Sequence, residues 1–173
     1  MHDTHLRPEL IRPPGGEGLW IGRGHLLLEK FRVADVERFG AAAEPYDVQE
    51  AENAILNGGA THVLTRLVGT AVTAFDATNG RCCVGNGTTA VTGTQTDLQG
   101  ASTLRKALDA APTVSGSTLQ AVATFLAADA NFAWQEAGLA ITTGTLLNRF
   151  LQSFGTKTSS LQWTLTITVT LGN

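Results

Sequence analysis

Long apolar runs are missing from this chain of 173 residues. No stretch of about 18 consecutive apolar residues occurs, so the usual signature of a membrane-spanning helix is absent. The first ten residues, MHDTHLRPEL, carry acidic residues and a proline where a signal peptide needs a basic and then an apolar stretch. We therefore expect a protein made in the cytoplasm, with no membrane partner.

Charged residues are also scarce, and neither sign dominates. The chain has 12 Lys and Arg against 15 Asp and Glu, for a net charge of -3. A nucleic-acid-binding protein normally presents a basic face. We therefore expect no nucleic-acid partner.

Only two cysteines are present, and they are adjacent in the sequence. Cys82 and Cys83 would point to opposite faces of a strand, where they could not form an ordinary disulfide. The sequence predicts two reduced, buried thiols.

What charge there is lies mostly near the N-terminus. Residues 1–50 hold 6 of the 12 basic and 9 of the 15 acidic residues, and three of the five prolines precede position 15. Such a segment has little apolar surface with which to build a core of its own. We predict an extended N-terminal arm over residues 1–45 and a folded domain over residues 46–173.

The clearest element is the C-terminal segment LQWTLTITVTLGN. Its apolar residues alternate with glutamine and threonine, which in a strand places all of them on one face. A strand buried on one side only is typical of antiparallel sheets. The residues predicted to face the core are Trp163, Leu165, Ile167, Val169 and Leu171, together with Phe125, Phe132 and Trp134 of earlier segments.

Other short segments separated by Gly, Thr and Ser residues show strand patterns. They lie at 81–84, 119–125, 131–142 and 146–154, and a threonine-rich loop is predicted at 88–102. In the third segment, alternation places Glu136 on the face of Trp134, and in the fourth it places Arg149 with Leu147. The fold class predicted is mainly β, an antiparallel, jelly-roll-like sandwich with one short helical element and the extended arm.

Helical patterns are limited to the region before residue 70. The stretch VQEAENAILNGGATHVLTRLV predicts a helix that ends at Asn57-Gly58-Gly59, followed by further apolar residues at helical spacing. The preceding stretch HLLLEKFRVADVERFG fits either a strand or, from Val33, a short helix.

Residues that could carry chemistry are few and do not cluster. Metal binding needs three or four converging ligands, which the four dispersed histidines do not supply: His2, His5, His25 and His62. No phosphate-binding loop or nucleophile motif is complete. The sequence therefore predicts no catalytic residue, no metal, no cofactor and no small-molecule substrate.

Glu136 is the strongest candidate for an enzymatic role, because it lies between Trp134 and Gly138 in an apolar segment. The alternative interpretation, which we favour, is that its side chain ties a hairpin to a neighbouring backbone.

Four segments together resemble a family of tailed-bacteriophage structural proteins. They are NAILNGGATHVLTRLVGTAVTAFDATNGRCCVGNGTTAVTGTQTDLQGA, ATFLAADANFAWQEAGLA, LLNRFLQSFGTK and QWTLTITVTL, within residues 53–171. The resemblance implies a non-enzymatic virion component, either a capsid decoration (cement) protein or a tail- or baseplate-associated protein. It does not cover the arm.

If the protein decorates capsids, its expected partners are the major capsid protein and further copies of itself, as a trimer in the virion. A long arm would add contact area without enlarging the core. The arm residues predicted to contact the partner are Arg7, Leu10, Ile11, Arg12, Leu19, Trp20, Ile21 and Arg23. A carbohydrate-binding sandwich is a further alternative, which would need Trp20, Trp134 and Trp163 in an exposed line.

Overall fold

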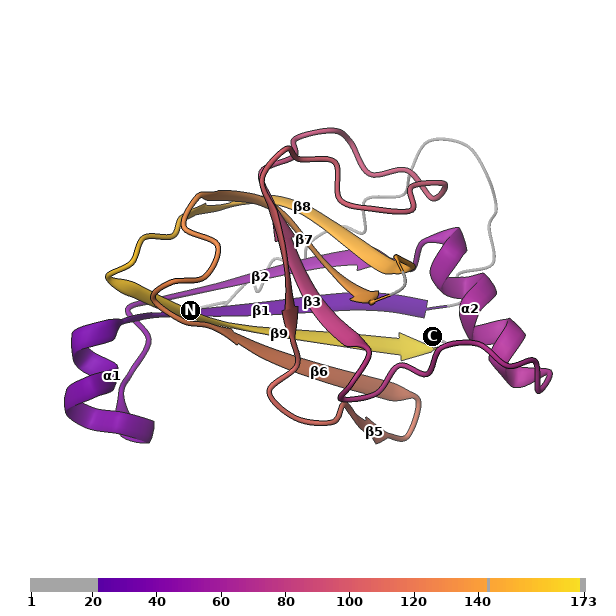
Figure 1. Ribbon diagram of the computed structural model, residues 1–173, viewed down its shortest axis with the longest axis horizontal. Helices are drawn as coiled ribbons and strands as arrows, with labels where there is room; N and C mark the ends of the chain where they lie inside the picture. The colour runs from indigo at the N-terminus through magenta and orange to yellow at the C-terminus, as the bar shows by residue number, and fades with distance from the viewer. Residues whose placement is uncertain (1–21, 143, 172–173) are drawn as a thin grey trace, which may run out of the picture.

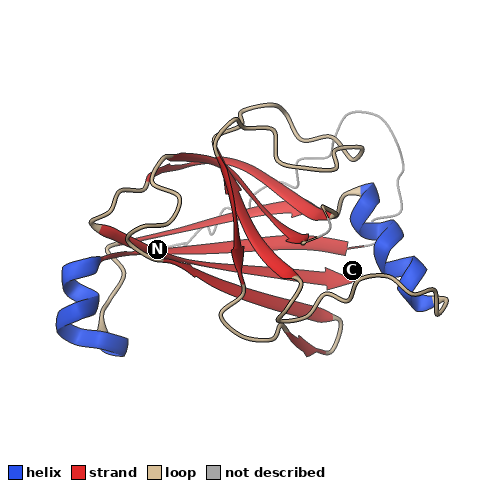
Figure 2. Ribbon diagram, in the orientation of Figure 1, coloured by secondary structure: helices blue, strands red, loops and turns tan. Residues whose placement is uncertain are grey.

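Two antiparallel sheets pack face to face in the computed structural model, which describes residues 22–142 and 144–171 (Figures 1 and 2). The five-stranded sheet has the order β2-β1-β9-β6-β5, and the four-stranded sheet has the order β4-β3-β7-β8. The predicted mainly-β sandwich is confirmed.

Two short α-helices and one 3-10 turn accompany the strands in the described part of the chain. In chain order the elements are β1 (Gly22–Arg32), α1 (Val33–Phe39), η1 (Gly40–Ala42), β2 (Asp47–Ala54), α2 (Asn57–Leu67), β3 (Gly80–Gly85), β4 (Thr103–Ala107), β5 (Thr113–Ser115), β6 (Thr118–Phe125), β7 (Ala133–Ile141), β8 (Leu146–Thr156) and β9 (Leu161–Leu171).

The C-terminal strand β9 lies in the middle of the five-stranded sheet, between β1 and β6. Its apolar face is buried as predicted: Trp163, Leu165 and Ile167 are at most 1% exposed. The prediction is wrong for Leu171, which is 40% exposed because it lies at the open end of the sandwich.

The core centres on three aromatic rings contributed by both sheets. Trp134 of β7 stacks edge-on against Phe125 of β6 and against Trp163 of β9, with centroid separations of 4.7 Å in each pair. Such T-shaped pairs add to the free energy gained by burying the rings. The predicted burial of all three is confirmed, and Phe132 is partly buried against them.

The predicted arm is wrong for residues 22–32, because they form β1 and belong to the sandwich. It pairs with β9 over its whole length, from Gly22 opposite Leu171 to Arg32 opposite Leu161. Leu26 and Leu28 are fully buried in the core, and Lys30 on the same face is 4% exposed, whereas Arg23, His25 and Glu29 lie on the outer face. The count of charged residues over residues 1–50 does not distinguish the two faces of a strand, so it gave no indication of β1. The calls on residues 1–21 lie outside the described residues.

The helix predicted to end at Asn57 is also wrong. Residues 47–54 form the edge strand β2, paired with β1, and Asn57 begins α2 instead of ending a helix. A Cβ on Gly59 would lie 2.8 Å from the Cα of Leu147. This glycine therefore allows α2 to approach the backbone of β8. Both interpretations of the stretch HLLLEKFRVADVERFG hold in part, because it forms strand β1 up to Arg32 and helix α1 from Val33. The described part of the chain thus has two α-helices where one helical element was predicted.

Replacing Ile167 with Ala should lower the free energy of unfolding by about 2 to 5 kcal/mol, because the side chain is fully buried and its removal leaves a cavity. The control is Thr168→Ala on the outer face, with an expected loss of a few tenths of a kcal/mol. Urea denaturation of both variants measures the difference. The opposite order would show that the register of β9 is shifted by one residue.

Candidate functional site

A long loop, residues 86–102, joins β3 to β4 and extends from one end of the four-stranded sheet (Figure 1). It contains no helix or strand, as predicted for residues 88–102. Loops of this length without regular structure are uncommon in compact domains, and many of them are functional. We therefore consider this loop and the residues that hold it as the candidate site.

The carboxylate of Glu136 holds the two ends of the loop together. It is fully buried, and its Oε1 accepts hydrogen bonds from the backbone N–H of Gly87 at 3.1 Å and of Gly100 at 2.7 Å. The N–H of Gln99 lies 3.0 Å from each carboxylate oxygen. One side chain of β7 thus binds both the start and the end of the loop.

Arg149 of β8 completes this arrangement from the neighbouring strand. Its Nε donates to Oε2 of Glu136 at 2.6 Å, and both side chains are fully buried. Its Nη1 donates to the carbonyl of Thr89 at 2.9 Å and to Oε1 of Gln95 at 3.1 Å. The buried ion pair therefore contacts the middle of the loop as well as its ends.

A register shift in the β7–β8 hairpin places Glu136 on the loop side of the sheet. The shift lies between Trp134 and Glu136, so Trp134 and Ala137 both face the core while Glu136 faces away from it. The predicted common face for Trp134 and Glu136 is therefore wrong. A second register shift lies between Leu139 and Ala140. Leu147 faces the core and Arg149 does not, so the predicted common face of these two residues is also wrong.

Two glycines leave the room that the carboxylate needs. A Cβ at Gly85 or at Gly87 would lie 2.5 Å from Oε1 of Glu136. A contact that short requires the carboxylate or the loop to move. Close packing around Glu136 therefore explains why glycine occupies positions 85 and 87, in addition to any turn preference.

The hydrogen bonds of Glu136 define its role. Its two oxygens receive three backbone N–H groups and one guanidinium, which leaves little capacity to accept a substrate proton or to bind a metal. The predicted tie between the hairpin and a neighbouring backbone is confirmed. Sequence reasoning missed Arg149, because no local pattern relates it to a partner 13 residues away.

The cysteines behave as predicted. Both are free and buried, Cys82 in the main core and Cys83 in a second apolar cluster with Leu98 and Leu146. Burial raises the pKa of Cys83 to about 12 and also raises that of Cys82. Both thiols are therefore protonated at neutral pH.

The basic pair Arg105 and Lys106 lies on strand β4. Arg105 contacts Asp97 of the long loop, and Lys106 contacts Asp129 at 2.5 Å. Each cation is thus paired with a carboxylate.

The remaining candidates do not form a shared site. His25 lies on β1, 3.7 Å from Glu50, whereas His62 lies on α2, and no metal-binding group of three His, Cys, Asp or Glu residues occurs within residues 22–142 and 144–171. Trp134 and Trp163 are in the core, so they offer no exposed platform for a sugar. His2, His5 and the arm residues up to Ile21 lie outside the described range, and Arg23 is exposed on β1.

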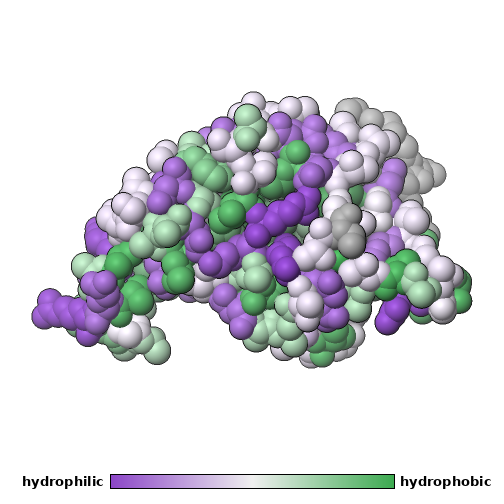
Figure 3. Space-filling view, viewed as in Figure 1, coloured by the Kyte–Doolittle hydropathy of each residue, from purple (hydrophilic) through white to green (hydrophobic). Residues whose placement is uncertain are grey.

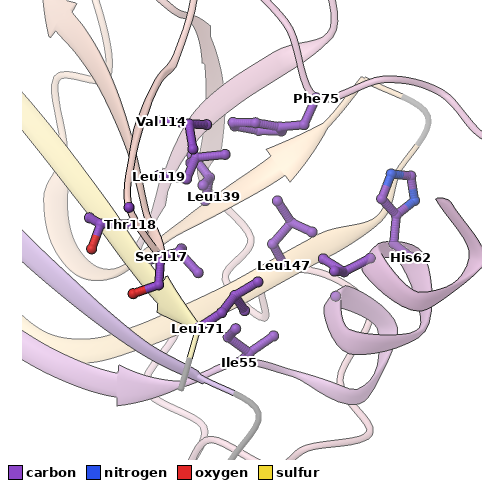
Figure 4. A pocket seen from close by; sticks show the side chains of 14 residues that line it. Ile55, His62, Phe75, Val114, Ser117, Thr118, Leu119, Leu139, Leu147 and Leu171 are labelled. Atoms are coloured by element: carbon purple, nitrogen blue, oxygen red, sulfur yellow. The ribbon is translucent and has the colours of Figure 1, made fainter. Parts of the chain in front are cut away.

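A second feature is an apolar cavity of about 280 Å³ at the open end of the sandwich (Figure 4). Its walls come from both sheets, from α2 and from the β5–β6 turn. The apolar lining includes Ile55, Val63, Phe75, Leu119, Leu147 and Val169. Among the described residues that line the cavity, His62 is the only titratable one.

Comparison of the chain with protein-family models, with curated proteins and with solved structures gives no match. Neither α1 nor α2, the α-helices of the described part, is long and apolar enough to cross a membrane.

Replacing Glu136 with Gln should destabilise the fold by about 3 to 5 kcal/mol, because Arg149 is then left buried without a counter-charge. Urea denaturation measures the loss, and hydrogen exchange at the amides of Gly87 and Gly100 should become faster. The matched control is Asp97→Asn, which removes a solvent-exposed ion pair of the same loop and should cost at most about 1 kcal/mol. Equal losses in the two variants would contradict the assigned role of the buried pair.

Replacing Gly87 with Ala tests the packing around the carboxylate. The added methyl group would lie 2.5 Å from both Oε1 of Glu136 and the backbone nitrogen of Gly100. We expect a loss of about 1 to 3 kcal/mol from overpacking. Gly93→Ala, in the same loop, places its Cβ 3.2 Å from the side-chain oxygen of Asn57 and should change stability by less than about 0.5 kcal/mol. Thermal melts of both variants provide the comparison.

Proposed function

We propose that this protein is a non-enzymatic structural component of a tailed-bacteriophage virion, a capsid decoration protein that binds over junctions between major capsid proteins. The observation that carries the proposal is the long, exposed loop held in one conformation by the buried Glu136–Arg149 pair. Burying two charges is costly unless both are paired and hydrogen-bonded. Here the backbone of the loop supplies several of those hydrogen bonds, and they fix the shape of the loop. A preorganised loop loses little entropy when it binds a partner.

The exposed part of the loop suits contact with another protein. Residues 86–96, with the sequence NGTTAVTGTQT, contain no charged residue. Most of their side chains are exposed, and Val91 is 38% exposed. The buried centres of protein interfaces are likewise depleted in charged residues.

The segments that carry the resemblance to phage structural proteins lie together in this fold. The loop comes from the first segment, Glu136 from the second and Arg149 from the third. Trp163 of the fourth segment packs against Trp134 of the second. The four segments thus form one connected set of contacts in this fold.

The outer face of the five-stranded sheet offers a second surface, suited to further copies of the chain in a trimer. On this face the hydroxyl oxygens of Thr124 and Thr164 lie 3.4 Å apart, and those of Thr118 and Thr170 lie 3.1 Å apart. Hydroxyl groups on a sheet can exchange partners with a neighbouring copy at small desolvation cost. The arm residues Arg7, Leu10, Ile11 and Arg12 are proposed to contact the major capsid protein.

Binding to undecorated particles tests the proposal, with capsids and tails assayed separately. Full-length protein should bind capsids, and deletion of residues 1–18 should weaken retention by about tenfold or more, because a second point of attachment is lost. The deletion stops before Gly22, which pairs with Leu171 in the sheet, so the thermal melting temperature should not change. Gly87→Ala should also weaken binding, whereas Gly93→Ala serves as a control for a general effect of loop mutation.

The results distinguish the alternatives. Binding to tails alone would overturn the capsid assignment in favour of a tail-associated protein. Equal retention of the truncated and full-length proteins would refute the role of the arm, and binding to neither particle would refute the virion role.

A further inference from the structure

The apolar cavity at the open end of the sandwich is suited to bind apolar side chains. Apolar surface that faces water lowers stability, and a concave apolar patch commonly marks a contact site. Two of its lining residues are well exposed: Val114 is 72% exposed and Leu171 is 40% exposed. Apolar surface is also exposed at the lower right of Figure 3. On α2, Leu64 is 50% exposed and Leu67 is 80% exposed.

The size and chemistry of the cavity do not suit a metabolite. Its volume of about 280 Å³ lies just below the usual range for ligand pockets, roughly 300 to 1,000 Å³. Such pockets also present a few converging polar groups. Among the described lining residues, the polar side chains are those of His62 and, on the opposite side of the view, Ser117 and Thr118, so they do not converge (Figure 4). One or two apolar side chains would fill the space better.

The described chain begins beside this cavity. A Cβ built on Gly22 would lie 2.7 Å from Cδ1 of Ile55 and 3.1 Å from Cδ2 of Leu171, and both of those residues line the cavity. The three residues that precede Gly22 in the sequence are Leu19, Trp20 and Ile21. Since a residue spans at most about 3.6 Å, the Cα of Trp20 lies within about 7 Å of that of Gly22. Its side chain can therefore reach the cavity.

We propose that the side chain of Trp20 of the same chain occupies this cavity as the main anchor, with Leu19 and Ile21 next to it in the sequence. The covalent link to Gly22 makes their local concentration very high, so the contact needs no second copy of the protein. This assignment gives Trp20 a different role from the one predicted from the sequence. It fixes the point where the arm leaves the domain, while Arg7, Leu10, Ile11 and Arg12 remain free to contact a partner.

The test uses full-length protein labelled with 5-fluorotryptophan, studied by 19F NMR without any virion component. Trp134 and Trp163 serve as internal references for buried rings, because they are at most 1% exposed. The Trp20 resonance is assigned by its loss in Trp20→Phe. We expect this resonance to show no solvent isotope shift between H2O and D2O, like the two references. A full isotope shift at Trp20 would overturn the proposal.

A pair of double variants tests the location. Val114→Gln with Leu171→Gln places amides at the mouth of the cavity and should restore the full isotope shift of Trp20. The matched control is Val48→Gln with Leu151→Gln, at exposed positions outside the lining, 49% and 40% exposed. Val48 and Val114 lie on the two edge strands of the same sheet. The control should leave Trp20 protected, and an equal response in both double variants would overturn the location.

Stability and concentration complete the test. Trp20→Ser should lower the melting temperature by about 4 °C or more in the native background. In the Val114→Gln and Leu171→Gln background, the same substitution should have less than about half that effect, because the two sites share one contact. Protection of Trp20 should be the same at about 5 µM and about 500 µM protein, a range that spans the dissociation constant of a weak dimer. Protection that appears only at the higher concentration would assign the cavity to a second copy and overturn the proposal.

Discussion

The buried ion pair between Glu136 and Arg149 is the interaction on which the presented surface of this protein depends. Removing two charges from water is costly unless each is paired and hydrogen-bonded. Here Glu136 receives the guanidinium and three backbone N–H groups, so the carboxylate is satisfied only when the loop is closed over it. The loop also depends on the pair, because the amides of Gly87 and Gly100 at its two ends donate to the same carboxylate oxygen. The pair, the loop and the β7 register shift therefore form one unit.

Stability and specificity come from different parts of the sandwich. The aromatic cluster of Phe125, Trp134 and Trp163 buries large apolar surfaces between the sheets, which is the main driving force for folding. The ion pair adds little net free energy by comparison, but it selects a single loop conformation. Trp134 and Glu136 are two residues apart and face opposite sides of their sheet. One strand thus links the core directly to the exposed loop.

The end of the sandwich beside α2 is built around Leu147. Its carbonyl accepts a hydrogen bond from the N–H of Leu56 at 2.9 Å, and α2 packs against its backbone through Gly59. These contacts hold the helix beside the cavity and leave the space between the sheets open at that end. The first residue of β1, Gly22, lies at the same end.

The sequence by itself determined the parts of this fold that follow local periodicity. Alternation over residues 161–171 predicted both the strand and its buried face, and the adjacent cysteines were correctly expected to be buried thiols. Only the tertiary structure decided that residues 22–32 form an internal strand of the sheet, because charged residues occur on both of its faces and the pairing with β9 and β2 involves distant segments. The same is true of Glu136. Its face depends on a register shift, and its partners lie 13 to 49 residues away in sequence. Side-chain patterns report the nearest few residues, whereas strand pairing, bulges and buried charges are selected by the free energy of contacts between distant segments.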